Sequence, residues 1–270
     1  MKQPIGVFDS GLGGLTVVRH LHRLLPGEDI VYFGDTARVP YGSKSPEAVI
    51  RFSRENCSFL VSQNVTMIIV ACNTSSALAL GALRQEHRVP IYDVIAPGSR
   101  KAVSLTRVGK IGVIGTHATI RSGAYEREMR ELADAVRVYS RPCPLFVPLA
   151  EEGWLDRPAT VEIAREYLLP LKEEGIDVLI LGCTHYPALR ETIRLVMGEE
   201  VSLVDSGRCC AEAVRDEMVP QNKGRAGGRV RYFVSDMPER FREIGRLFMK
   251  EEINEVTVVS AEKIPFQAKI

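Results

Sequence analysis

Cys72 and Cys183 stand in the same local setting, which makes them the clearest candidates for chemistry in the sequence. Each follows an apolar segment of strand length, 67–71 for Cys72 and 176–181 for Cys183, and each precedes residues that can begin a helix. Thiols at helix N-termini are favoured as thiolates, and their pKa falls from about 8.5 into the range ~3.5–7.5. A lone buried cysteine is usually a small packing residue, but a repeated pair followed by polar residues predicts chemistry.

Active sites use paired thiols in three ways. Disulfide exchange usually requires C-x-x-C spacing, and neither cysteine has that neighbour. A zinc site could take Cys72, Cys183 and His185, but three ligands at this spacing are a weak pattern without a fourth. The third use is proton transfer, in which a thiolate removes a proton from one face of a tetrahedral carbon and an opposing thiol delivers one to the other face. Such a pair inverts a stereocentre without a cofactor.

A second repeat supports two related units with one cysteine each. Ile5-Gly-Val-Phe-Asp-Ser10 resembles Ile111-Gly-Val-Ile-Gly-Thr116, at nearly the interval that separates the cysteines. Strands alternate with helices along the chain, which favours parallel sheets covered on both faces, and ligands bind such sheets outside the carboxyl ends of their strands. The residues that directly follow an apolar strand, and that we expect to line one crevice, are Asp9, Cys72, Thr116 and Cys183.

The pattern of apolar residues and turn formers predicts the following elements. We expect strands at 5–8, 30–33, 67–71, 90–93, 111–114, 136–139, 176–181, 202–204, 230–234 and 256–259. We expect helices at 15–25, 46–63, after Cys72, at 96–106, from about 119 to 133, at 159–174, 188–197 and 237–250, and one capped by Asp205 and Ser206. Segment 143–150 reads as a loop and segment 221–228 as a flexible linker.

The turn Asp9-Ser-Gly-Leu-Gly-Gly14 comes next to a helix N-terminus, where backbone N–H groups attract anions. Its spacing does not match G-x-G-x-x-G, so it is a poor dinucleotide site. The sequence leaves open whether the turn is a simple connection or a carboxylate or phosphate site. Asp9 itself could cap the following helix, and capping does not exclude a catalytic role.

Composition excludes several classes of protein. The chain has 270 residues, of which 45% are hydrophobic and 26% charged, as in an ordinary globular protein large enough for two lobes. A net charge of +1 without a basic run argues against nucleic acid and membrane surfaces as partners. No apolar stretch is long enough to cross a bilayer. Six cysteines without an export signal predict reduced thiols in the cytoplasm.

Five motifs occur in order along the chain: Asp9-Ser-Gly-Leu-Gly-Gly14, Pro40-Tyr-Gly-Ser43, Ala71-Cys-Asn-Thr74, Thr116-x-x-Thr119 and Gly182-Cys-Thr-His185. Together they resemble the cofactor-independent amino-acid racemase family that contains the glutamate and aspartate racemases. The resemblance covers essentially the whole chain. Two departures, Ser75 where alanine is common and Lys44 where members vary, do not touch the chemistry.

The resemblance implies roles for individual residues. Cys72 and Cys183 would be the two acid/base residues, with Asp9 and His185 as polar assistants, one on each side. Glu151 resembles a further acidic helper, although the neighbouring residue is also a glutamate, which leaves the assignment open by one position. The implied substrate contacts are Asp9, Ser10, Tyr41, Gly42, Ser43, Asn73, Thr74, Thr116, Thr119, Thr184 and His185.

These substrate contacts suit an acidic amino acid. Hydroxyls and backbone N–H groups can hold both carboxylates of glutamate, and Asp9 or Asn73 can meet its ammonium group. The resemblance implies racemisation of L-glutamate to D-glutamate for bacterial peptidoglycan synthesis, and hence for cell-wall biogenesis and cell shape, with no cofactor or metal, in a cytoplasmic homodimer. Two alternatives stay open: a racemase of aspartate or a related diacid, and a non-catalytic anion- or metal-binding module that uses Gly11–Gly14 and the Cys/His set.

The expected fold is α/β, with two similar lobes related by a pseudo-two-fold axis. Each lobe would have a mostly parallel sheet flanked by helices, and the active site would lie in the cleft between them. The resemblance implies a discontinuous first lobe, 1–95 and 208–270, because the strands near 230 and 256 need a sheet to join. The second lobe would be 96–207. Lobes hinged in this way could close on the substrate.

Overall fold

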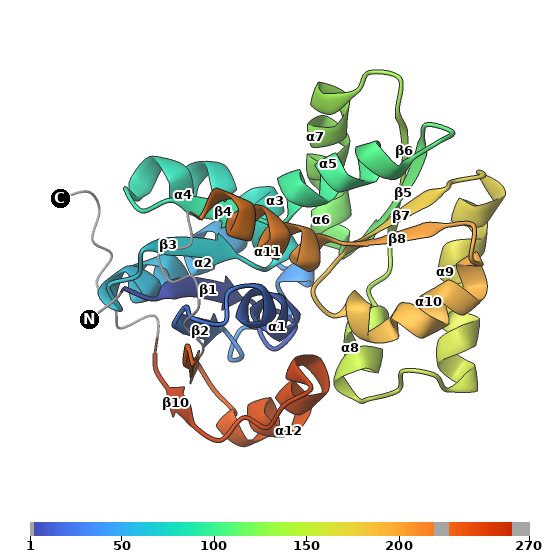
Figure 1. The fold of residues 1–270 in the computed structure, drawn as a ribbon. Helices are drawn as coiled ribbons and strands as arrows, with labels where there is room; N and C mark the ends of the chain where they lie inside the picture. Colours follow the sequence, from blue (N-terminus) through green and yellow to red (C-terminus); the bar gives the residue numbers. More distant parts are fainter. Residues whose placement is uncertain (1–2, 219–226, 261–270) are drawn as a thin grey trace.

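Two parallel sheets covered by helices form the structure, a computed structural model that describes residues 3–218 and 227–260 (Figure 1). Within these residues, the first sheet has the strand order β10-β9-β2-β1-β3-β4 and the second has the order β6-β5-β7-β8. The first sheet contains β1 (Ile5–Asp9), β2 (Ile30–Gly34), β3 (Met67–Val70), β4 (Ile91–Asp93), β9 (Val230–Val234) and β10 (Val256–Val258). The second contains β5 (Lys110–Gly115), β6 (Arg137–Pro142), β7 (Val178–Gly182) and β8 (Ser202–Asp205). The predicted α/β class is confirmed.

The central strands are buried along their whole length because helices cover both faces of each sheet. Every residue of β1, β2, β3 and β7 is buried, which explains their continuous apolar runs. In the first sheet, Phe8 pairs with Val70, and in the second, Gly115 pairs with Gly182. The register therefore brings the residues after β1 and β3 to one edge, and those after β5 and β7 to another.

Helices connect the strands and cover the sheets. The helices are α1 (Leu15–Leu24), α2 (Pro46–Ser62), α3 (Asn73–Leu78), α4 (Leu80–Glu86), α5 (Ile95–Leu105), α6 (His117–Arg121), α7 (Ala124–Leu132), α8 (Phe146–Glu151), α9 (Pro158–Glu173), α10 (Arg190–Met197), α11 (Ser206–Glu217) and α12 (Pro238–Met249), with short 3-10 helices η1 (Tyr41–Ser43) and η2 (Tyr186–Leu189). Helix α11 lies between the two halves and contacts α1 on one side and α5 on the other (Figure 1). Asp205 caps it by accepting the N–H of Arg208 at 3.1 Å, as predicted.

One hydrophobic core runs through both halves. It extends from Val7 in β1 through Leu15 and Val17 in α1 to Leu181 in β7 and Phe146 in α8. A shared core fixes the position of the two sheets relative to each other in this state. Among the described residues, no helix combines the length and the apolar character needed to cross a membrane.

The structure differs from the predicted elements at three places. The helix predicted after Cys72 is two helices, α3 and α4, which meet at Ala79. Segment 143–150 is not a loop throughout, because it contains most of α8. Pro148 is the third residue of this helix, a position where the missing N–H costs nothing, and so the proline does not break it. The helix predicted to end near 133 is two helices, α6 and α7, separated at Gly123, whose backbone is left-handed with φ 64°.

The prediction that the C-terminal strands join the first sheet agrees with the topology, since β9 pairs with β2 and β10 pairs with β9. The lobe boundaries at 1–95, 96–207 and 208–270 stay a prediction. Of the linker predicted at 221–228, residues 221–226 lie outside the described residues.

Candidate active site

A narrow pocket at the carboxyl ends of both sheets contains both cysteines of the repeated motifs. Its lining residues come from both halves of the fold and are Ser10, Val39, Pro40, Tyr41, Gly42, Cys72, Asn73, Thr74, Thr116, Val147, Cys183, Thr184 and His185. The two cysteines are 4% and 6% exposed, so both thiols are almost fully shielded from bulk water. Of the four residues expected to line one crevice, Cys72, Thr116 and Cys183 line this pocket, with one thiol from each sheet, and Asp9 is not among its lining residues.

Cys72 lies in an anionic environment. It is the residue before α3, and Asp9 at the end of β1 is its charged neighbour. Burial raises the pKa of the Cys72 thiol to about 11, and the charge of Asp9 acts in the same direction, while hydrogen bonds from Ser75 and Ser10 oppose the rise. The predicted lowering of this pKa is therefore wrong for Cys72, because a helix of only six residues cannot offset the loss of water.

Asp9 is fully buried and is held by the turn that follows it. Its Oδ2 accepts the N–H of Gly11 at 3.0 Å, and its Oδ1 accepts the hydroxyl of Thr184 at 3.4 Å. Burial raises the pKa of Asp9, against the positive charge of His185 and the N–H donors of the turn. The N-cap residue of α1 is Gly14 rather than Asp9, and the Asp9 carboxyl accepts a hydrogen bond from the Gly14 backbone.

Cys183 lies in a cationic environment. His185 Nδ1 is 3.8 Å from the Cys183 sulfur, and His185 Nε2 is 3.0 Å from Glu151 Oε1. Burial, which includes an edge-on contact with the ring of Phe248, acts to lower the pKa of His185, but the contacts with Cys183 and Glu151 outweigh it and raise that pKa to about 10. The ion pair with His185 outweighs burial at Glu151 as well and lowers the pKa of its carboxyl. The pair is therefore an imidazolium and a carboxylate.

The geometry separates the two adjacent glutamates. Glu151 contacts His185 and lies just behind the pocket lining, whereas Glu152 is largely exposed and pairs with Arg240 of α12 at 3.0 Å. The sequence could not distinguish them, because the choice depends on the phase of α8.

Three threonine hydroxyls cluster where the two halves meet. Thr74 Oγ1 lies 3.0 Å from Thr116 Oγ1 and 3.2 Å from Thr119 Oγ1, and the last two are 3.0 Å apart. All three side chains are buried, and Thr74 and Thr116 line the pocket. Each hydroxyl can donate or accept, so the cluster can reorganise to donate to an anion.

The segment 41–43 contributes less than its motif suggested. The Tyr41 hydroxyl donates to Asp35 and accepts from Asn56 at 3.0 Å, so it is already paired within the first half. Tyr41 and Gly42 line the pocket, but Ser43 is exposed, and its hydroxyl donates to the carbonyl of Pro40 at 3.3 Å.

In the part of the chain that the structure describes, no three His, Cys, Asp or Glu side chains gather as a metal site. The set Cys72, Cys183 and His185 that the sequence left open for zinc is thus not grouped for one.

Comparisons with known proteins agree with this geometry. Residues 5–214 match the family model described as Asp/Glu/Hydantoin racemase. A glutamate racemase from Geobacter metallireducens is 50% identical, over 96% of this chain and 97% of that protein. The crystal structure of glutamate racemase from Francisella tularensis subsp. tularensis in complex with D-glutamate has a TM-score of 0.89 and 39% identity, covering 96% of this chain and 98% of that chain.

The chain belongs to the Asp/Glu/hydantoin racemase family. The resemblance read from the five motifs is thereby confirmed, as is the prediction that the protein is an isomerase, an amino-acid racemase. Family membership favours an enzyme over the non-catalytic binding module that the sequence left open.

Within this racemase, sequence reasoning missed the apolar part of the pocket. Val39, Pro40 and Val147 line it, and Val147 belongs to α8, which was expected to be a loop. Pro40 belongs to the motif Pro40-Tyr-Gly-Ser43, and only its position next to that motif could have indicated Val39. For Val147 the sequence carries no signal, because its place depends on the unrecognised helix.

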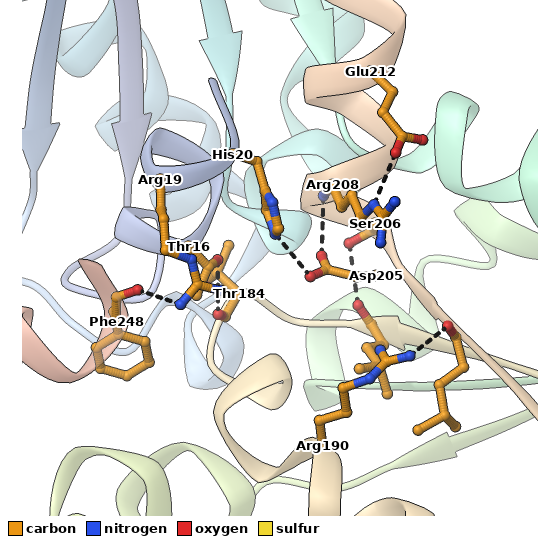
Figure 2. A network of polar contacts seen from close by, with 12 residues as sticks. Thr16, Arg19, His20, Thr184, Arg190, Asp205, Ser206, Arg208, Glu212 and Phe248 are labelled. Atoms are coloured by element: carbon orange, nitrogen blue, oxygen red, sulfur yellow. Dashed lines mark hydrogen bonds and ion pairs between the residues drawn. The ribbon is translucent and has the colours of Figure 1, made fainter. Parts of the chain in front are cut away.

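Helix α1 holds the turn after Cys183 in this racemase (Figure 2). Thr16 Oγ1 lies 3.2 Å from the Thr184 carbonyl oxygen, and one turn later His20 Nε2 lies 3.2 Å from Asp205 Oδ2. Gly13, just before α1, allows this approach, since a Cβ there would lie 2.6 Å from His185 Nδ1. The Gly-rich turn of the first half therefore packs against the Cys183 side of the pocket.

Proposed function

We propose that this racemase interconverts L- and D-glutamate by two-base proton transfer, with Cys72 and Cys183 on opposite faces of the α-carbon. The observation that carries the proposal is one pocket lined by both buried thiols, each with its own ionisable neighbour. No cofactor takes part in the proposed reaction.

The proposed proton movements balance in a single turnover. The Cys183 thiolate takes the α-proton from one enantiomer, and the Cys72 thiol delivers its own proton to the opposite face of the carbanion. The product is the mirror image, with Cys183 now a thiol and Cys72 a thiolate. For the other enantiomer the roles exchange. His185 and Asp9, one beside each thiol, then return the pair to its starting protonation through solvent once the pocket opens.

The α-proton of an amino acid is a weak acid, so the carbanion needs electrostatic stabilisation. The threonine hydroxyls at 74, 116 and 119, with Asn73 and Thr184, supply donors for the two carboxylates of glutamate. Asp9 and Ser10 suit the ammonium group. Exclusion of water strengthens each of these contacts.

We assign glutamate rather than aspartate because the curated relative from Geobacter metallireducens is named a glutamate racemase and the Francisella structure holds D-glutamate. We further propose that the product supplies peptidoglycan synthesis in the cytoplasm and that the protein acts as a homodimer. A hinge between lobes 1–95/208–270 and 96–207 would admit substrate to a pocket whose cysteines are nearly fully buried.

Circular dichroism of L-glutamate incubated with the purified protein tests the proposal. We expect the optical signal to decay to zero without pyridoxal phosphate and in the presence of a chelator, and D-glutamate to decay equally. Aspartate serves as the comparison substrate. Persistent optical activity with glutamate but decay with aspartate would assign the diacid alternative, and persistence with both would reject the two-thiol reaction.

A further inference from the structure

The amide of Asn73, the residue after Cys72, is held by two buried side chains from other parts of the fold. Tyr125 of α7 donates its hydroxyl to Asn73 Oδ1 at 2.7 Å. Ser206, the first residue of α11, has its Oγ 3.4 Å from Asn73 Nδ2. Each of the three side chains is at most 2% exposed. Neither Tyr125 nor Ser206 lines the pocket, and the sequence indicated Ser206 only as part of a helix cap.

The short bond from the Tyr125 hydroxyl to Oδ1 selects the orientation of the amide, since Ser206 Oγ lies almost equally far from its two ends, 3.4 Å from Nδ2 and 3.5 Å from Oδ1. Burial raises the pKa of Tyr125, so its hydroxyl keeps its proton and donates to Oδ1. The Ser206 hydroxyl lies 3.1 Å from the Leu181 carbonyl, to which it can give its only proton, and this leaves it as an acceptor for Nδ2. Turning the amide over would place Nδ2 against the Tyr125 hydroxyl, and the hydrogen bond that this hydroxyl donates to Oδ1 would be lost, whereas Ser206 could donate to Oδ1 instead.

The same two residues also contact the strand that leads to Cys183. The ring of Tyr125 packs against Gly182, where a Cβ would lie 3.1 Å from Tyr125 Cε2. Ser206 reaches Leu181, one residue earlier in β7. Tyr125 and Ser206 therefore connect the backbone just before Cys183 to the side chain just after Cys72.

We infer that Tyr125, assisted by Ser206, is a positioning residue that fixes the Asn73 amide with one N–H available to the bound substrate. Nδ2 carries two N–H groups and makes one hydrogen bond among the described residues, and Asn73 lines the pocket. The fixed amide therefore acts as a donor to a substrate carboxylate rather than as an acceptor for its ammonium group. The inference rests on the proposed function, in which Asn73 contacts glutamate.

Tyr125→Phe tests the inference, because it keeps the ring against Gly182 and removes only the hydroxyl. We expect kcat to fall about tenfold in both directions, the equivalent of one well-placed hydrogen bond, with KM within about threefold of the wild type. Tyr139→Phe is the matched control, since Tyr139 is a half-buried tyrosine of β6 outside the pocket lining, and kcat should not change. Ser206→Ala should lower kcat by a smaller factor, about threefold.

A double-mutant cycle separates positioning from general packing. In an Asn73→Ala background, Tyr125→Phe should cause no further loss of kcat, because the amide that it orients is gone. An equal tenfold loss in both backgrounds would overturn the inference, as would a Tyr125→Phe enzyme within twofold of the wild type. Thermal unfolding of each variant checks that the fold is retained.

Side-chain amide NMR gives a readout that does not depend on turnover. The Nδ2 protons of Asn73 should exchange with solvent faster in Tyr125→Phe than in the wild type or in Tyr139→Phe, and unchanged exchange would contradict the positioning role. If the wild type failed to racemise glutamate, the proposed function would be rejected, and this exchange measurement would still decide whether Tyr125 orients Asn73.

Discussion

The two cysteines occupy equivalent places at the ends of β3 and β7, but their surroundings carry opposite charge. Cys72 has the fully buried carboxyl of Asp9 as its neighbour, and its pKa is raised to about 11. Cys183 lies 3.8 Å from His185, an imidazole whose pKa is raised to about 10 and which pairs with Glu151. Duplicated strands thus place the two thiols alike, while their neighbours differ: a buried carboxyl beside Cys72 and an imidazole beside Cys183.

The largest effect should come from removing either thiol. Cys72→Ala and Cys183→Ala should each lower kcat for racemisation by about 10²–10⁴-fold, because a two-base reaction needs an acid and a base on opposite faces. Cys57→Ala is the control, since Cys57 is buried in α2 away from the pocket lining. Near-native turnover by either active-site variant would show that racemisation does not require both thiols.

Removing the charge beside Cys72 should make the two sides more alike. In Asp9→Asn the pKa of Cys72 should fall, because the negative charge that raises it is gone. At pH 8, alkylation of Cys72 by iodoacetamide should then be about threefold to tenfold faster, as read by peptide mass spectrometry. The exposed Asp134→Asn is the control. A rate that did not rise would mean that Asp9 does not set the reactivity of this thiol.

The smallest effect concerns stability on the Cys183 side. Because the pKa of His185 is raised in the folded protein, its protonation adds to the free energy of unfolding. This stabilisation is complete below pH 6.5, the ordinary pKa of histidine, and is lost as the pH rises toward 10. Because the pKa of Glu151 is lowered, its ionisation also adds to the free energy of unfolding. This stabilisation is present above pH 4.5 and is lost as the pH falls below that value. Glu151→Gln should therefore lower Tm most between pH 4.5 and 6.5, by about 2–4 °C.

Glu152→Gln is the matched control for that measurement, because Glu152 pairs only at the surface with Arg240. Its Tm should stay within about 1 °C of the wild type. A deficit of Glu151→Gln that was the same at every pH would contradict the imidazolium–carboxylate pair.

From the sequence, the positions of the reactive groups could be predicted better than their pKa values. Cys72 and Cys183 could be placed because an apolar strand followed by a polar residue is a local pattern, and parallel pairing such as Gly115 with Gly182 brings those ends together. The pKa of Cys72 could not be predicted, because desolvation depends on how the two halves close over it. The contact of Tyr125 could not be predicted either, because its hydroxyl donates to Asn73, a residue 52 positions earlier in the chain.

Local sequence signals were also misleading where a residue typical of loops lies within a helix. Proline in segment 143–150 suggested a loop, yet Pro148 falls in the first turn of α8, where it is tolerated. Without that helix the sequence could not assign Glu151 to His185 or place Val147 in the pocket.

Hydrogen exchange at the α-carbon tests most directly the claim that the two thiols serve opposite faces. Each enantiomer of glutamate is incubated in heavy water with Cys72→Ala and with Cys183→Ala, and deuterium at the α-carbon is followed by NMR. We expect each variant to exchange the α-hydrogen of only one enantiomer, and the two variants to act on opposite enantiomers. Exchange of the same enantiomer by both variants, or of both enantiomers by either one, would contradict that claim.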